Sequence, residues 1–198
     1  MPKPKKPYHH GDLSEALLRA TRDVLRKEGL AALSLREVAR RAGVSHGAPA
    51  HHFRDKAGLL TAFATEGFVK FRDAMCAARD AAVGGRARFA ATGVAYVLFA
   101  RDHREHFEIM WRPELHDHTD EKLMIAASAS YEVLLGVVRE AQAEGYAKRT
   151  PEDIVAKRSW ALAHGLASLW VQGNLGHSPG EPDLETLTHA VIDSYLKD

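Results

Sequence analysis

The chain has 198 residues, of which 45% are hydrophobic and 27% charged, a composition close to that of an ordinary soluble protein. No apolar run reaches the roughly 18–20 residues that a membrane-spanning helix needs, and the basic start has no apolar stretch after it, so we expect neither a membrane span nor a secretory signal. Cys76 is the only cysteine, which excludes an intrachain disulfide and fits a reducing cytoplasm.

The net charge of +1 hides an asymmetry along the chain. Residues 1–56 hold twelve Lys or Arg and six Asp or Glu, whereas residues 57–198 hold fifteen and twenty. A basic head on an acidic body suggests that the head meets a polyanion, although a merely soluble basic surface would look the same.

Apolar residues recur with a helical period and no alternating strand pattern is present, so we predict an all-α fold of about nine helices. The expected helices are 13–28, 35–42, 46–52, 56–82, 86–101, 103–111, 119–146, 151–174 and 184–196. Capping residues mark several helix starts: Asp12, Ser34, Ser45 and Asp55. We place the domain division near residue 57, which gives an N-terminal three-helix domain over 1–57 and a larger helical domain over 58–198.

A tight turn joins two of the short helices, 35–42 and 46–52. In this turn, Ala42-Gly43-Val44-Ser45, Gly43 reverses the chain, Val44 fills the gap between the helices and Ser45 caps the next helix. These features predict a helix-turn-helix, whose second helix enters the major groove of DNA while the first crosses the backbone.

The exposed positions of this unit suit DNA. Arg36, Arg40 and Arg41 lie on the polar face of helix 35–42, and Lys56 stands at a helix start, where the dipole and free N–H groups form an anion site suited to phosphate. The extended arm from Lys3 to His10 either follows phosphates or is a solubilising tail. The candidate DNA-binding residues are Ser34, Arg36, Ser45, His46, Gly47, Ala48, Ala50, His51, His52 and Lys56.

This segment resembles the DNA-binding domain of the tetracycline-repressor (TetR) family of bacterial regulators. The matching positions are Gly29, Ser34, Val38-Ala39, Ala42-Gly43-Val44-Ser45, His52-Phe53, Lys56 and Leu59-Leu60. The stretches 8–13, 45–49 and 159–170, the last with Trp160 and His164-Gly165, resemble one subgroup of that family. Ala50 stands where the family usually has an aromatic residue that often touches phosphate, which puts that contact in question.

The resemblance implies a homodimer in which helices 151–174 and 184–196 of each subunit form a four-helix interface. It also implies a ligand pocket, whose occupation changes the spacing of the two heads and releases DNA. We therefore predict a ligand-responsive DNA-binding regulator, either a repressor released from its operator by a small molecule or an activator. The candidate pocket residues, each of which also suits core packing, are Phe99, His103, Phe107, Met110, Trp111, Tyr131, Trp160 and His164.

Two other classes are disfavoured. The sequence has no nucleophile elbow, phosphate-cradling glycine loop or HExxH motif, so we expect no enzyme and no cofactor. A helical interaction module with a basic head on a membrane is also disfavoured, because the polar face of helix 13–28 mixes both charges. A metal site is not expected, since the histidines near 103–118 lack the helix-spaced pairs that a defined site needs.

Overall fold

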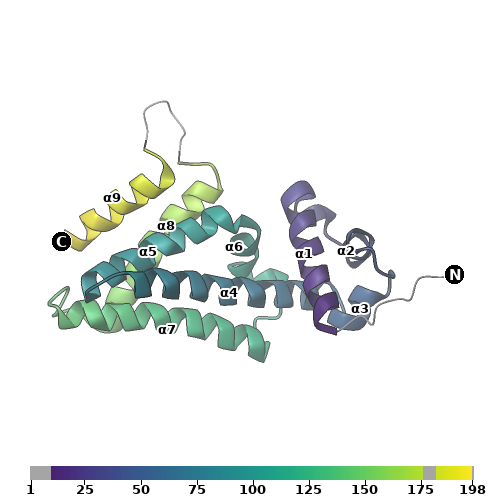
Figure 1. Ribbon diagram of the computed structural model, residues 1–198, viewed down its shortest axis with the longest axis horizontal. Coiled ribbons are helices and arrows are strands. Elements are labelled where there is room, and N and C mark those ends of the chain that lie inside the picture. Colours follow the sequence, from purple (N-terminus) through teal and green to yellow (C-terminus); the bar gives the residue numbers. More distant parts are fainter. Residues whose placement is uncertain (1–9, 176–181, 198) are drawn as a thin grey trace.

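The computed structural model describes residues 10–175 and 182–197 (Figure 1). Across these residues the secondary structure is helical throughout and contains no strand, which confirms the predicted all-α fold. Two 3-10 helices, Leu30–Ala32 and Pro113–Leu115, accompany nine α-helices in the described part of the chain. The α-helices are α1 (His10–Glu28), α2 (Leu35–Ala42), α3 (Ala48–Phe53), α4 (Lys56–Ala81), α5 (Gly85–Asp102), α6 (Arg104–Met110), α7 (Glu121–Ala143), α8 (Glu152–Val171) and α9 (Leu184–Lys197).

The first three helices form a small head at one end of the molecule, and α4 runs from this head into the body (Figure 1). The head is held by apolar side chains that are fully buried, among them Leu17 and Val24 of α1 and Val38 of α2. Leu59 and Phe63 of α4 are fully buried in the same core. The core of the head therefore continues along α4 into the body.

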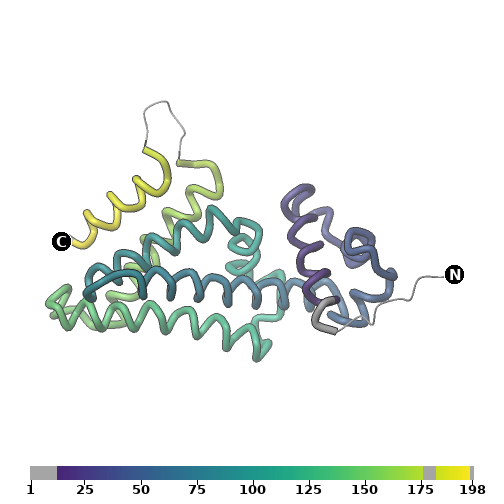
Figure 2. Tube along the Cα trace, viewed as in Figure 1, coloured from purple at the N-terminus to yellow at the C-terminus, as the bar shows by residue number. Residues whose placement is uncertain are grey.

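The body is a bundle in which α4 packs against α5 and α7, while α5 also packs against α8 and α9 (Figure 2). A second buried cluster, which includes Val137, Val138 and Ile192, closes the end of the bundle far from the head. None of the described helices is both long enough and apolar enough to cross a bilayer.

Some predicted helix ends are confirmed by their capping contacts. The Oγ of Ser34 accepts a hydrogen bond from the N–H of Glu37 at 3.2 Å, and the Asp55 carboxylate accepts one from Gly58 at 2.8 Å. Gly43 ends α2 in the left-handed conformation, with φ of 67°. These ends depend on neighbouring residues only, which is why a local pattern identifies them.

Two predicted caps are wrong. Helix α1 begins at His10, so Asp12 lies within the helix; its side chain belongs to the part of the chain that is not described. Helix α3 begins at Ala48 with Gly47 at its N-cap, and no side chain caps it. The backbone carbonyl of Ser45 instead accepts a hydrogen bond from the N–H of Ala48 at 3.0 Å, because a turn at residues 46–47 precedes the helix.

Candidate functional sites

The turn between α2 and α3 fixes how α3 is presented. Gly43 adopts a φ of 67°, and its N–H donates to the carbonyls at the end of α2. The Val44 N–H donates to Ala39 at 3.1 Å, and the Val44 side chain packs against the core of the head. The turn thus anchors the chain just before α3, as a helix-turn-helix requires.

Helix α3 packs against the head through its apolar residues, and its other side chains are exposed. Pro49 is buried and Phe53 is half-buried, whereas Ala50, His51 and His52 are exposed. Of the remaining candidate DNA-binding residues, Ser34, Ser45, His46 and Gly47 are also exposed, and Ala48 is half-buried. The structure therefore brings small side chains and imidazoles together on one accessible surface.

The three arginines of α2 differ in their surroundings. Arg36 is exposed, and Arg40 pairs with Glu37 at 2.6 Å while 64% of its side chain stays exposed. Arg41 is only 17% exposed and bonds both Glu37 and Glu28, so it ties α2 to the end of α1. The hydrogen bonds from Arg40 and Arg41 lower the pKa of Glu37 to about 2, which keeps this carboxylate charged.

Two cations flank the start of α4. Lys56 is exposed, and its Nζ lies 3.4 Å from the carbonyl of Leu30, to which it donates. Arg54, which was not among the predicted DNA-binding residues, has a side chain that is 90% exposed and a backbone φ of 69°. The only local signal for Arg54 was its position between the end of one helix and the Asp55 cap of the next.

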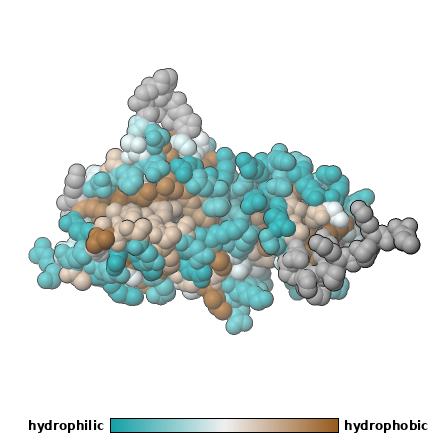
Figure 3. All heavy atoms as spheres, in the orientation of Figure 1, coloured by the Kyte–Doolittle hydropathy of each residue, from teal (hydrophilic) through white to brown (hydrophobic). Residues whose placement is uncertain are grey.

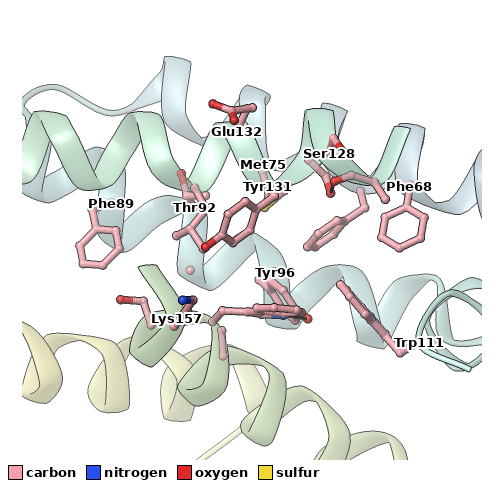
Figure 4. Close-up of a pocket in the computed structure, with 18 residues that line it drawn as sticks. Phe68, Met75, Phe89, Thr92, Tyr96, Trp111, Ser128, Tyr131, Glu132 and Lys157 are labelled. Carbon is pink, nitrogen blue, oxygen red and sulfur yellow. Dashed lines mark hydrogen bonds between the residues drawn. The ribbon is translucent and has the colours of Figure 1, made fainter. Parts of the chain in front are cut away.

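A cavity of about 560 Å³ lies in the body between α4, α5, α7 and α8 (Figure 4). Its volume is in the range of small-molecule sites, and its walls are mostly apolar and aromatic. The lining residues are Phe68, Phe71, Met75, Phe89, Thr92, Gly93, Tyr96, Trp111, Ala127, Ser128, Ser130, Tyr131, Glu132, Leu134, Lys157, Ser159, Trp160 and Ala163.

Part of the predicted pocket set lines this cavity, namely Trp111, Tyr131 and Trp160. Phe99, Phe107 and Met110 are buried in the core outside the lining, and His103 is half-buried where α5 meets α6. His164 also lies outside the lining, behind Tyr96. The lining residues that were not predicted come from all four helices, α4, α5, α7 and α8, because helical periodicity does not distinguish a cavity wall from a filled core.

Tyr96 joins two helices at the cavity wall through its hydroxyl. This hydroxyl accepts a hydrogen bond from Nε1 of Trp160 at 3.2 Å and lies 2.8 Å from Nδ1 of His164. Burial raises the pKa of Tyr96 and lowers the pKa of His164, so both groups are neutral at neutral pH. The Tyr96 hydroxyl thus forms hydrogen bonds with two side chains of α8, and these bonds hold α5 against α8.

Helix α6 lies between the cavity and the head. Trp111, at the end of α6, lines the cavity. Glu105 on the same helix lies 4.0 Å from the guanidinium of Arg26 in α1, and the His106 ring stacks on Phe63 of α4 at 4.1 Å. Residues of α6 therefore contact the cavity, the head helix α1 and α4.

Apolar side chains remain exposed on α8. Ile154 is 47% exposed, Leu169 42% and Trp160 36%. Figure 3 shows apolar surface gathered along one face of the body, away from the head. Ile154 and Leu169 share one face of α8, whereas Trp160 lies on the opposite side and lines the cavity. An exposed apolar helix face is typical of a surface that another protein covers.

Comparisons with known proteins match both parts of the chain. The family model "Bacterial regulatory proteins, tetR family" matches residues 17–63, and "Tetracyclin repressor-like, C-terminal domain" matches residues 89–195. The HTH-type transcriptional regulator BetI of Escherichia coli (strain SE11) is 25% identical over 186 residues, covering 91% of this chain and 92% of BetI.

Two solved structures have the same fold. A protein with unknown function from Rhodococcus sp. RHA1 is 38% identical, with a TM-score of 0.81 and 98% of each chain covered. The regulator FadR from Bacillus subtilis, solved in complex with stearoyl-CoA, is 14% identical, with a TM-score of 0.69 and coverage of 92% of this chain and 97% of FadR. At that identity, FadR shows the shared fold alone.

Proposed function

Because the chain belongs to the tetracycline-repressor family of bacterial regulatory proteins, we propose that it is a repressor whose α3 reads operator DNA and whose cavity holds the releasing molecule. The chain is a ligand-responsive, DNA-binding transcriptional regulator and not an enzyme. The observation that carries the assignment of α3 is its exposed surface of small and imidazole side chains beside the cations of α2 and α4.

The proposed DNA surface combines two kinds of contact. His46, His51 and His52 meet base edges or phosphates, since an imidazole can donate or accept a hydrogen bond. Arg36 and Lys56 meet the backbone on either side, and Arg54 joins them because 90% of its side chain is exposed beside the start of α4. Arg41 stabilises the head instead, because its guanidinium already forms ion pairs with Glu28 and Glu37.

We further propose that two copies pair through α8 and α9. The exposed Ile154 and Leu169 of α8 support this pairing, as do the family's typical homodimers. A division near residue 57 separates head from body functionally, and the protein acts in the cytoplasm, where its operator lies. Trp160 and His164, which mark the suggested subgroup, both bond Tyr96, which gives that motif a role at the cavity wall.

The releasing molecule is proposed to occupy the aromatic cavity. The FadR structure with stearoyl-CoA shows that a protein of this fold accommodates a ligand with a large apolar part. In this chain, Trp111 connects the cavity to α6, which contacts both α1 and α4. Occupation of the cavity would shift α6 and change the spacing of the paired heads.

The DNA-binding part is tested by selecting duplexes from a random library with the purified protein and mapping the protected region. We expect a repeated half-site and a steep salt dependence, with orders of magnitude lost between about 50 and 200 mM salt. Retention of no duplex at low salt, or binding that salt does not weaken, would contradict the proposal.

A further inference from the structure

The hydrogen-bonding groups of the cavity wall define what its occupant can be. Four hydroxyl-bearing residues of the lining are at least nine-tenths buried: Thr92, Tyr96, Ser130 and Ser159. Thr92 donates to the Arg88 carbonyl at 2.8 Å, and Ser130 donates to the Ala127 carbonyl at 2.7 Å. The other two are also engaged, because Ser159 lies 2.6 Å from the Val155 carbonyl and Tyr96 bonds His164.

The hydroxyls of Thr92, Ser130 and Ser159 donate in these contacts and keep acceptor lone pairs, since each hydroxyl has one hydrogen and two lone pairs. Within the described chain, two lining residues have hydroxyls without a hydrogen-bond partner: Tyr131, which is half-buried, and Ser128, which is exposed. Figure 4 shows the Tyr131 ring directed inward from α7. Nε1 of Trp111 also has no partner, but this atom is closed off from solvent and does not face the open space.

Charge is confined to the edge of the cavity. Lys157 and Glu132 are the charged lining residues, and both are exposed. Lys157 pairs with Asp153 at 3.3 Å, and Figure 4 shows the Glu132 carboxylate directed away from the Tyr131 ring. An ion placed inside would lose its hydration without gaining a counter-charge, which is strongly unfavourable.

From this arrangement, we propose that the effector is an uncharged, largely aromatic molecule that carries a hydroxyl group, as a phenol does. The hydroxyl would accept from Tyr131 and donate to one of the buried oxygens, and the ring would pack among Phe71, Trp111 and Trp160. A carboxylate offers only acceptors to a wall that has mostly acceptors, so it fits poorly. This inference rests on the proposal that the cavity is the effector site.

The test is calorimetric titration of the full-length protein, near neutral pH, with 2-naphthol, 2-methoxynaphthalene and 2-naphthoate. These probes share one ring system and differ in having a neutral donor, a neutral acceptor or a charged acceptor. We expect 2-naphthol to bind at least about ten-fold more tightly than the other two, because a buried group that lacks its partner is costly.

Tyr131→Phe should weaken 2-naphthol binding several-fold without loss of folding, since its hydroxyl has no partner in the protein. Tyr146→Phe is the matched control, because Tyr146 lies outside the lining. Loss of the Tyr146 hydroxyl should leave the affinity for 2-naphthol unchanged. If 2-methoxynaphthalene or 2-naphthoate bound as tightly as 2-naphthol or more tightly, the requirement for a neutral donor would be overturned. The proposal that the cavity is the effector site would not be affected by that result. Binding of none of the probes, by a protein that still binds DNA, would overturn both.

Discussion

At the scale of single residues, Lys56 and His51 offer different chemistry to DNA. Lys56 is a point charge on a flexible stem beside the start of α4, whereas His51 is a planar donor and acceptor on α3. We predict that Lys56→Ala weakens binding to all duplexes alike and lowers the salt slope by about one. His51→Ala should instead reduce discrimination at one base position, by about 1–3 kcal/mol.

The measurement is affinity for the selected duplex and for single-base variants of it, at several salt concentrations. Lys122→Ala, an exposed lysine on α7, is the control and should change neither quantity. If Lys56→Ala and His51→Ala had the same effect on every duplex, the assigned division of roles would be refuted.

Tyr96 is the residue on which the cavity wall depends most. Tyr96→Phe leaves Nε1 of Trp160 and Nδ1 of His164 without their shared partner, so we predict a loss of about 1–3 kcal/mol in the free energy of unfolding. Urea denaturation measures this loss. Tyr131→Phe removes a hydroxyl with no partner in the protein and should change stability by much less; a similar loss in both variants would show that the Tyr96 bonds contribute little.

Residues whose role depends on near neighbours could be identified from the sequence, as Ser34, Gly43 and Asp55 show. Residues whose role depends on distant segments could not. In the sequence, Arg41 does not differ from the other arginines of α2, yet in the structure it forms an ion pair with Glu28 of α1. Tyr96 looks like any apolar-face residue of α5 until α8 places Trp160 and His164 beside it.

At the scale of helices, a partly buried network joins α6 to α4. Nε2 of His106 lies 3.2 Å from Glu66, which also bonds Lys70 at 2.5 Å. Burial raises the pKa of the Glu66 carboxyl, but the hydrogen bonds with His106 and Lys70 outweigh it and lower the pKa to about 2. Because this pKa is below its ordinary value of 4.5, the charged form stabilises the fold above that value.

We therefore predict that the free energy of unfolding falls as the pH drops from 4.5 toward 2, and that Glu66→Gln shows a smaller fall over the same window. Urea unfolding at a series of pH values measures the slope. Glu121→Gln, an exposed residue of the first turn of α7, is the control and should keep the wild-type slope. An unchanged slope in Glu66→Gln would contradict the assignment.

Helices α5 and α7 approach closely at Gly85. A Cβ at this position would lie 2.4 Å from the backbone of Glu140, which cannot move as a side chain would. We predict that Gly85→Ala destabilises the protein by more than about 2 kcal/mol, since overpacking forces backbone shifts. Gly136 in α7 faces open space, so Gly136→Ala should instead stabilise by about 0.5–1 kcal/mol. Thermal unfolding of both variants tests the pair; equal shifts would contradict the close approach.

At the scale of the whole molecule, the helical periodicity predicted the number and order of the α-helices well. It predicted their ends less well: α7 ends at Ala143 rather than near residue 146, and Glu144 instead bonds the N–H groups of Gly85 and Arg86. That contact joins segments far apart in the chain, and no local pattern encodes it. The arrangement of α4, α5, α7 and α8 around a cavity also depends on contacts between distant segments, so no local pattern predicts it.

The proposed pairing of two copies is the largest-scale prediction. Leu169 is 42% exposed on α8, within the face that we assign to the interface. Leu169→Glu should place two carboxylates in an apolar contact and yield a monomer, because a buried charge without a partner is strongly unfavourable. Val83→Glu is the matched control: Val83 is 91% exposed beyond the end of α4, and the variant should remain a dimer.

Light scattering on the eluting protein measures the mass, and duplex binding measures the consequence. A dimer holds two reading heads at half-sites separated by a helical turn or a multiple of it, roughly 34–36 Å per turn. A monomer holds one head, so it should lose most of its affinity for the repeated site while binding one half-site as weakly as the wild type does. If Leu169→Glu stayed dimeric, the interface would lie elsewhere; if it became monomeric and kept full affinity, the heads would not act as a pair.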